Sequence, residues 1–426
     1  MLLQTGPFLE ELQKQFMRLE SDEVMGRLRG NAWTRLLERG LPQKKEEAFQ
    51  YVHLRELYEK SYALPEKMAA PSTEELSSLI LPECTNSCLV FVEGVYSPEL
   101  SKVPPGLIVL PLPKALRSYQ TLLQGRLEGA IAGESDPFAL LNLAFAAGEA
   151  GVFIYLPPKK SLEAPLQCLH LSRQQGVIAS PRIHAFIGRE AELQIISSFQ
   201  PAEGAWINSM LDLTLEEGAR VKQASTLLNE SRSWIFDAIR ATQKRDSSLE
   251  TVSISRGAKS HRQSFNIALT GENAEASLNG TWLLNNDFSC HAHVLVDHSA
   301  PHTRSRQLFK GVLDGISQSS FEGKIFVHPE AQKTEAYQLN NNLILGERAL
   351  AFSKPNLQIF ADDVKASHGA TIGQLDANLL FYLKTRGIPD SIASRLLVRA
   401  FCQEVGAKLP LPSMRAQLAQ ELARYL

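Results

Sequence analysis

The side chains of this sequence best suited to metal binding are histidines, and four of them occur in the segment HAHVLVDHSAPHT. They are His291, His293, His298 and His302. Alternate side chains of a β-strand share one face, so His291 and His293 could hold one metal ion if this segment is a strand. With a later acidic residue, such a pair would serve a stand-alone metal-dependent β-fold enzyme of the cupin-like type. The alternative is that these histidines form side-chain hydrogen bonds within a stack of buried strands.

A further histidine, His368, lies in the segment 354–386, where a strand pattern gives way to a helix pattern. Leu357 and Ile359 alternate with polar residues, as expected of a strand. The Ser-His-Gly sequence at 367–369 predicts a turn, because glycine tolerates backbone angles that other residues resist. The imidazole could ligate iron or zinc, or it could hydrogen-bond the backbone of the turn.

Beyond this predicted turn the sequence indicates a short helix over 377–386. Asp376 stands where an N-cap belongs, and Gly387 stands where a helix ends. Tyr382 and Arg386 are four residues apart and share one helix face, and both residue types are enriched at binding hot spots. This helix therefore either binds a partner or packs within the tail of the chain. The candidate partner-binding residues are Phe381, Tyr382, Arg386 and Gly387.

Familiar catalytic motifs are missing from the sequence. Asp362 and Asp363 are adjacent, and neighbours on a strand point to opposite faces, so we expect no acid–base pair from them. The chain has no GxxxxGK[ST] phosphate loop, no GxSxG elbow and no HExxH motif. We therefore expect that it is not an enzyme by itself and that any ATPase is a partner.

The cysteine content and the net charge indicate in which cellular compartment the protein works and which classes of partner it does not bind. The five cysteines are an odd number at wide spacing, which argues against a disulfide framework. Cys84 and Cys88 form a CxxxC pair without a second pair, and we expect ordinary thiols there. A formal net charge of −2 gives no basic surplus for nucleic acid or anionic membranes. No apolar run approaches ~18 residues and no signal or transit pattern opens the chain, so we expect a cytoplasmic protein.

The order of the patterns predicts three parts: helices and a linker over 1–82, strands over 83–370 with one inserted helix near 136–149, and helices over 371–426. Four small turns in the middle part end in alanine, at Ala191, Ala219, Ala274 and Ala331. Their gaps of 28, 55 and 57 residues approximate one, two and two steps of about 28, a period typical of solenoids. A β-sandwich would also give short strands, but it would not need this phase, so the spacing favours a β-helix.

Several segments resemble the SufD family, core scaffold subunits of the SUF machinery for iron–sulfur cluster assembly. They are ADDVKASHGAT at 361–371, FYLKTRGI at 381–388, the Gly-Leu-Pro turn and the charged, aromatic segment within 31–57, DPFALLNLAFAAGE at 136–149 and the stretch at 303–313. The resemblance implies a mainly β protein with a right-handed parallel β-helix core between N-terminal and C-terminal helical domains. The paralogous SufB family typically has cysteines near the N-terminus and in the late coils. Here no cysteine precedes Cys84 and none lies between Cys290 and Cys402.

The resemblance also implies a function. The chain would be a scaffold in a SufB–SufC–SufD complex that assembles iron–sulfur clusters and passes them to apoproteins, with His368 as a cluster-assembling metal ligand shared with SufB. A SufC-like ABC ATPase, which binds the ATP, would dock on the helix of Phe381–Gly387, and the chain would form a homodimer when SufB is absent. It would hold no cofactor tightly by itself, since the cluster is transient. Ala366 stands where the family often has cysteine, so no thiolate can come from that position.

Overall fold

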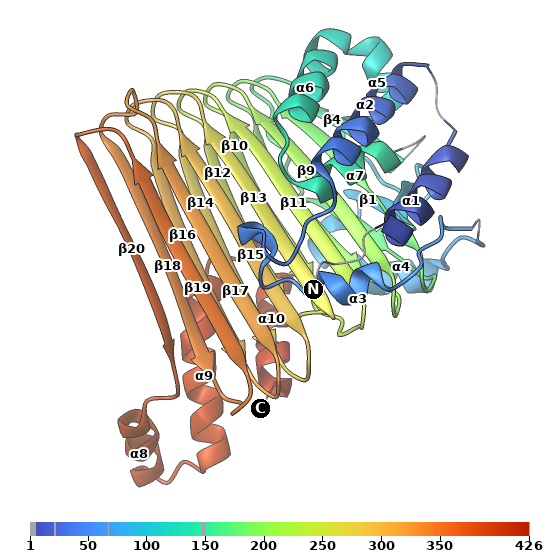
Figure 1. Ribbon diagram of the computed structural model, residues 1–426. Helices are drawn as coiled ribbons and strands as arrows, with labels where there is room; N and C mark the ends of the chain where they lie inside the picture. The colour runs from blue at the N-terminus through green and yellow to red at the C-terminus, as the bar shows by residue number, and fades with distance from the viewer. Residues whose placement is uncertain (1–5, 21–22, 67, 147–149, 426) are drawn as a thin grey trace.

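The computed structural model describes residues 6–20, 23–66, 68–146 and 150–425. Two ten-stranded sheets face each other along a solenoid and make up most of the protein (Figure 1). The first sheet contains, in spatial order, β2 (Val95–Tyr96), β1 (Cys88–Val92), β5 (Leu166–Leu171), β8 (Glu192–Gln200), β10 (Arg220–Leu227), β12 (Ser248–Ser255), β14 (Glu275–Leu284), β16 (Arg304–Leu313), β18 (Thr334–Ile344) and β20 (Val364–Gly373).

The second sheet runs from β19 at one end to β3 at the other. It contains β19 (Leu350–Ile359), β17 (Gln318–Val327), β15 (Ser289–His298), β13 (Ser260–Leu269), β11 (Trp234–Gln243), β9 (Trp206–Leu215), β7 (Arg182–Ile187), β4 (Gly151–Leu156) and β3 (Ile108–Pro111), with β6 (Ile178–Ala179) paired to β9. The β1–β2 and β3–β4 pairs are antiparallel, whereas the later strands pair in parallel with the next coil. This arrangement confirms the predicted parallel β-helix.

The predicted period is confirmed in the early coils and lengthens later. Arg220 pairs with Glu192 on one side and with Ser248 on the other, each 28 residues away. Ala191, Ala219 and Ala274 therefore hold equivalent positions, each following a residue with positive φ at a corner of the coil. The register Glu275↔Arg304↔Glu335 contains steps of 29 and 31 residues. Thr334, and not Ala331, therefore holds the position equivalent to Ala274, and the prediction for the fourth alanine is wrong by three residues. Longer corners absorb the extra residues without disturbing the ladder.

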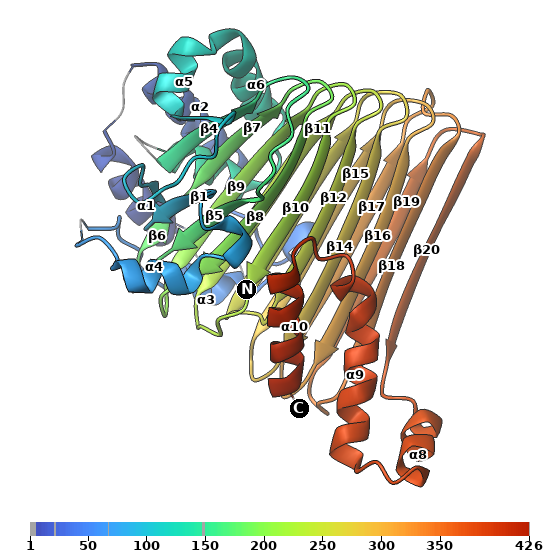
Figure 2. The same cartoon turned by 180° about the vertical axis from the view of Figure 1, so that it is seen from behind.

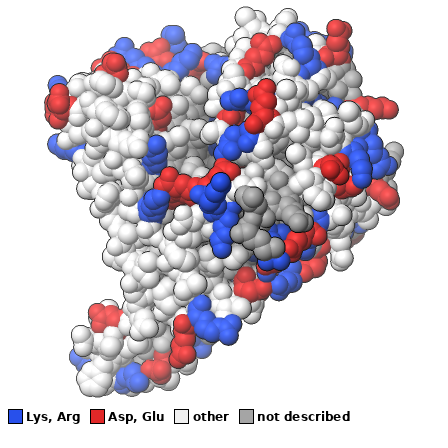
Figure 3. All heavy atoms as spheres, viewed as in Figure 1, with Lys and Arg blue, Asp and Glu red and all other residues white. Residues whose placement is uncertain are grey.

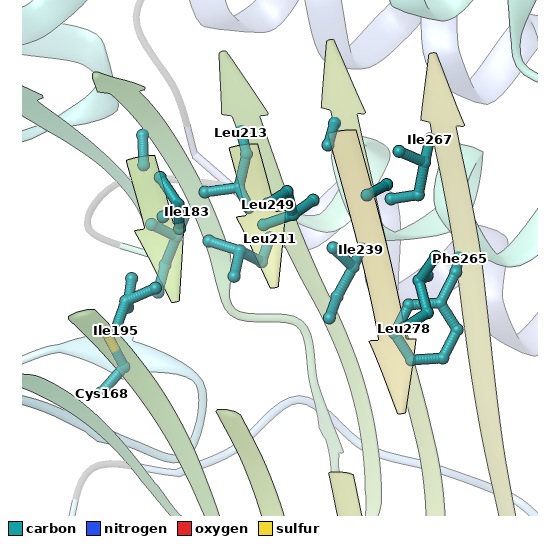
Figure 4. Close-up of a cluster of buried hydrophobic side chains, with 14 of the residues drawn as sticks. Cys168, Ile183, Ile195, Leu211, Leu213, Ile239, Leu249, Phe265, Ile267 and Leu278 are labelled. Atoms are coloured by element: carbon teal, nitrogen blue, oxygen red, sulfur yellow. The ribbon is translucent and has the colours of Figure 1, made fainter. Parts of the chain in front are cut away.

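The core of the solenoid is filled by aliphatic side chains that alternate inward along the strands. Leu211, Ile239 and Ile267 meet from neighbouring coils of the second sheet, and Leu249 and Leu278 face them from the first (Figure 4). Burial of this continuous apolar interior is what stacks the coils, because no single coil can cover its own inner face.

Helices cover the outer faces of the two sheets. The N-terminal group is α1 (Gly6–Arg18), α2 (Glu23–Arg39), η1 (Glu47–Phe49), α3 (Leu54–Tyr58), α4 (Thr73–Leu79), η2 (Pro82–Cys84), α5 (Leu112–Ser118), α6 (Gln120–Gly133) and α7 (Pro137–Phe145). α1, α2 and α7 lie on the outer face of the second sheet (Figure 1). Phe8 of α1 and Phe138 of α7 contact Trp206, and α2 packs against α7 within the same apolar cluster. No helix in the described parts of the chain is long and apolar enough to cross a membrane.

The C-terminal helices are α8 (Ala377–Thr385), α9 (Asp390–Gly406) and α10 (Pro412–Arg424). α9 and α10 lie on the outer face of the first sheet (Figure 2). Val398 and Cys402 of α9 and Met414 of α10 belong to one apolar cluster with Val252 and Leu283 of that sheet. α8 lies beyond that face, next to α9.

Several local expectations need correction. The predicted linker contains the helix α4, whose N-cap Ser72 accepts from the amide of Glu75. The inserted helix is present as α7, and the last three residues of its predicted range, 147–149, lie outside the described residues. α5 and α6 lie in the range 83–370, for which the sequence predicts strands and a single inserted helix. Pro113 lies in the first turn of α5, where proline is tolerated because the amide there needs no partner. The division into domains at 82/83 and 370/371 stays a prediction.

The structure also shows where the five cysteines and the adjacent acids Asp362 and Asp363 lie. All five cysteines are buried and free, which confirms that they form no disulfide framework. Burial raises the pKa of both Cys84 and Cys88 to about 12, as expected of inert thiols. Asp362 and Asp363 follow β19 in the corner before β20, not on a strand as predicted.

Candidate functional site at the open end of the solenoid

The last coil leaves one end of the solenoid open. β20 is the final strand of the first sheet and β19 the final strand of the second, and each pairs with a described strand on one side only (Figure 1). Edge strands of this kind present free backbone N–H and C=O groups to another chain. Apolar side chains are exposed here too, including Leu350 and Ile372. Over these last coils the face in Figure 3 is mostly uncharged.

His368 lies in the middle of β20, so the predicted turn at 367–369 is wrong. Its register partner in β18 is Gln338, while Ala366 pairs with Ala336 and packs in the apolar cluster of the last coils. Because side chains alternate, His368 shares the inner face with Ala366. The imidazole is nevertheless exposed, since no further described coil covers it. The imidazole therefore lies on the inner side of the last strand, at the open end of the solenoid, which we call the mouth.

Inside the solenoid, in the last coils next to His368, two buried polar atoms lack a hydrogen-bond partner among the described residues. Gln338 reaches across the interior, where its Nε2 donates to the carbonyl of Asn356 at 3.0 Å. A side chain at Gly323 would come within 2.3 Å of Gln338 Oε1, so the glycine makes room for this crossing. Gln338 Oε1 and Ser353 Oγ are buried, and within the described residues neither has a hydrogen-bond partner. The open end thus has two buried polar atoms without a hydrogen-bond partner inside the solenoid and an exposed imidazole on its last strand.

This chain alone offers few ligands for a metal ion at that place. The imidazole of His368 forms no hydrogen bond or ion pair with another described residue, so its ring nitrogens are available. Ala366 places a methyl group where a thiol two residues away would share the inner face. Across the described ranges no group of three His, Cys, Asp or Glu side chains could hold a metal ion. In the part of the chain that the structure describes, His368 therefore has no neighbouring side chains that complete a three-ligand metal site.

The helix α8 follows β20 and confirms the predicted start and end. Asp376 caps it by accepting from the amides of Asn378 (2.8 Å) and Leu379 (3.2 Å), and Gly387 follows it with φ +80°. None of its residues is buried. Phe381 is 69% and Tyr382 54% exposed. The Arg386 guanidinium lies 5.2 Å from the centre of the Tyr382 ring, which preorganises an aromatic–cationic surface.

The four clustered histidines do not form one site. His291 and His293 share the outer face of β15, as predicted, and lie beneath residues 47–52, whereas His298 points into the solenoid and His302 sits at a corner. His291 Nδ1 lies 2.9 Å from Ser320 Oγ, and burial lowers its pKa to about 3. His298 makes hydrogen bonds of 2.7 and 2.8 Å to Thr303 and Ser305. These contacts support the structural interpretation, and the solenoid differs from the jelly roll of cupins.

Comparison with known proteins agrees with this architecture. A family model described as the SufBD core domain of the SUF system for iron–sulfur cluster assembly matches residues 170–401, and one for the SufBD N-terminal region matches residues 9–168. The chain belongs to the SufBD family. The predicted resemblance to SufD is thereby confirmed, and the chain is a SufD-like member of a family that serves iron–sulfur cluster assembly.

Relatives cover nearly the whole of this SufBD family protein. A SufBD family protein of Synechocystis is 29% identical over 427 residues, covering 97% of this chain and 94% of the relative. The iron–sulfur cluster assembly protein SufD of Escherichia coli is 26% identical over 402 residues, covering 92% and 90%. A SufBD family protein of Mycobacterium leprae is 35% identical over 325 residues, covering 72% and 80%.

One charged network of this SufBD family protein was missed from the sequence. Arg262 donates to Asp136 at 2.6 Å, and Arg240 donates to Glu134 at 3.0 Å. Burial acts to raise the pKa of Asp136, but the two guanidinium groups outweigh it and lower this pKa. The network fixes the start of α7 on the outer face of the second sheet. The two residues of each pair lie more than 100 residues apart in the sequence, so no local sequence pattern predicts the pairing.

Proposed function

We propose that this SufBD family protein is the SufD-type scaffold subunit of a complex with a SufB-like paralogue and a SufC-like ABC ATPase. The observation that carries the proposal is His368, an exposed imidazole on the inner face of an edge strand, with Ala366 in place of a thiol. Family membership and the SufD relative support the role in iron–sulfur cluster assembly.

The SufB-like partner would bind at the open end. Its own edge strands would pair with β19 or β20 and would bring the thiolates that the mouth lacks. His368 would then act as one nitrogen ligand of a cluster that is assembled between the two chains and passed on to apoproteins. Without that partner, the same apolar edge would support a weaker homodimer.

The ATPase would dock on α8. This helix exposes Leu379, Phe381 and Tyr382 together, while Arg386 is held over the Tyr382 ring. A helix that exposes aromatic and arginine side chains is the kind of surface that forms binding hot spots. In this arrangement the partner binds and hydrolyses ATP, and the present chain is a scaffold and not an enzyme. A cytoplasmic location fits its five free, buried thiols.

Co-expression of this chain with the SufB-like and SufC-like chains tests the proposal. We expect a stable three-component complex that accumulates an iron–sulfur cluster during anaerobic reconstitution. Charged substitutions on the edge, Leu350→Lys with Ile372→Lys, should remove the SufB-like chain but keep the ATPase. A matched pair of distant exposed substitutions, Val95→Lys with Val103→Lys, is the control. Failure of the wild-type chains to associate would refute the assignment as a SUF scaffold.

A further inference from the structure

A cavity of about 280 Å³ lies between α6 and the outer face of the second sheet, on strands β4 to β13 and away from the open end. This size is at the small end of the range of ligand pockets, which suits a small metabolite. α6 forms one wall and the sheet forms the other. The charged and polar lining residues that matter for binding are Arg126, Glu134, His184, Asp212, Thr214 and Arg240.

Asp212 is the acid of this cavity that has ion-pair neighbours but accepts no hydrogen bond within the described residues. Its carboxylate lies 3.5 Å from His184 Nδ1 and 3.9 Å from the Arg182 guanidinium, and no side chain or amide in the described ranges donates a hydrogen bond to it. The side chain is 25% exposed, toward the cavity. Burial raises its pKa, although Arg182, Arg240 and Arg126 act in the opposite direction. A ligand with a hydrogen-bond donor would satisfy this acid.

The neighbouring histidine cannot serve a metal ion here. Arg182 Nε donates to His184 Nε2 at 2.7 Å, so that nitrogen must be the unprotonated one. The proton is therefore on Nδ1, which faces Asp212, and neither ring nitrogen of His184 has a lone pair free for a metal. The protonation of His184 thus favours an organic ligand with hydrogen-bond donors over a metal ion.

Arg126 supplies the opposite charge. Its Nη1 donates to Thr214 Oγ1 at 2.6 Å, and its second amino group lies 3.8 Å from Glu216, beyond hydrogen-bond distance. The side chain is 39% exposed, and the guanidinium lies 5.2 Å from the centre of the Phe186 ring. Its second amino group forms no hydrogen bond to a described residue and can therefore donate to an anion. Arg240, by contrast, is already engaged by Glu134 and Ser264.

The distance between the Asp212 carboxylate and the Arg126 guanidinium can be estimated from β9. This strand carries Asp212 and also Thr214, to which Arg126 of α6 donates. Thr214 and Asp212 lie on the same face of β9, two residues and therefore about 6.6 Å apart. An ammonium and a carboxylate on one carbon are about 3 Å apart, and a charge-assisted hydrogen bond at each end adds about 2.8 Å. A zwitterion held in this way spans about 8.6 Å. Arg126 contacts both Thr214 and Glu216, so its guanidinium lies beyond Thr214 as seen from Asp212. A ligand that spans somewhat more than about 6.6 Å can therefore bridge Asp212 and Arg126. Its remaining substituent would meet Leu122, Leu123 and Phe186.

We propose that this cavity binds a free α-amino acid with an apolar side chain, with the ammonium group on Asp212 and the carboxylate on Arg126. The site is separate from the open end, and the proposal does not rest on the scaffold function. It adds a metabolite-binding site to a chain whose other surfaces face proteins.

Calorimetric titration of the full chain with L-leucine tests this proposal. We expect saturable binding with a Kd between about 10 µM and 1 mM. Two probes each lack one charge: 4-methylpentanoate has no ammonium group and 3-methylbutylamine has no carboxylate. Each should bind at least roughly 10-fold more weakly than L-leucine, because one end of the site is then left unpaired.

Substitutions locate the binding in the cavity. Asp212→Asn and Arg126→Gln should each weaken L-leucine binding roughly 10-fold or more, whereas the exposed controls Asp246→Asn and Arg220→Gln should not change it. Circular dichroism shows whether each variant is folded, and Arg126→Gln keeps the test valid if Asp212→Asn is unstable. No binding of L-leucine, equal binding of 4-methylpentanoate, or full affinity in a folded Arg126→Gln variant would each overturn the proposal.

Discussion

Replacing His368 by alanine should abolish cluster accumulation while leaving the fold and the complex intact. In the structure the imidazole is exposed and makes no hydrogen bond to a described residue, so its removal should cost no more than about 0.5 kcal/mol of unfolding free energy. A buried histidine of the same chain behaves differently. His291 is 2% exposed and hydrogen-bonded to Ser320, so His291→Ala should cost about 1–3 kcal/mol.

These two substitutions separate a functional histidine from a structural one. The assay is anaerobic reconstitution of the complex, followed by visible absorption and by counts of iron and sulfide, with urea unfolding of each single chain. We expect His368→Ala to be stable and without cluster, and His291→Ala to be less stable but to carry cluster when folded. A normal cluster yield from His368→Ala, in a complex shown to be intact, would refute the role given to this residue.

Other consequences can be measured on the same proteins. Replacing Tyr382 and Arg386 by alanine should weaken binding of the SufC-like ATPase by roughly 2 kcal/mol or more, without loss of stability because α8 buries no residue; unchanged affinity by calorimetry would count against this dock. Light scattering at micromolar concentration should show a weak homodimer alone and a heterodimer with the SufB-like chain, and a strict monomer in both cases would contradict the open-edge interface. Burial lowers the pKa of His291 to about 3 and that of His298 to about 4, so the unfolded chain binds protons that the folded chain does not. The stability from these groups is therefore present above about pH 6.5 and is lost as the pH falls toward 4, by up to about 1.4 kcal/mol per pH unit for each histidine. Urea unfolding across this range should show the decline in wild type and a smaller one in His298→Gln, and a flat profile would contradict it.

Local sequence determined the features that depend on local backbone preferences. The step of about 28 residues came from small turns that end each coil, and the register Arg220↔Ser248 reproduces it. Asp376 and Gly387 mark the ends of α8 because an N-cap carboxylate and a glycine with positive φ satisfy the ends of any helix. The repeat favoured a β-helix, and the resemblance to the SufD family implied the same fold class. The place of α8 after the last strand followed from the helix-end signals.

The position of His368 was decided by the neighbouring coil and not by its own sequence. Gly369 suggested a turn, yet it lies in β20 without positive φ, because β18 offers a ten-residue ladder that the segment 364–373 can join. A side chain at Gly369 would come within 3.0 Å of Leu339, so this glycine serves close packing of the strands. Pairing over a full strand outweighs the turn preference of one residue.

Only the tertiary structure brought together the charged groups of the Asp136 network and of the cavity beside α6, both on the outer face of the second sheet. Asp136 meets Arg262 across 126 residues, and Arg126 meets Thr214 across 88. Such pairs depend on where α6 and α7 lie on the stacked coils. Helix placement is set by the apolar contacts around Trp206 and Phe236, and nothing in the few residues around each charge encodes it. The sequence by itself thus determined the repeat and the helix ends, and the stacking of coils decided which polar side chains face one another.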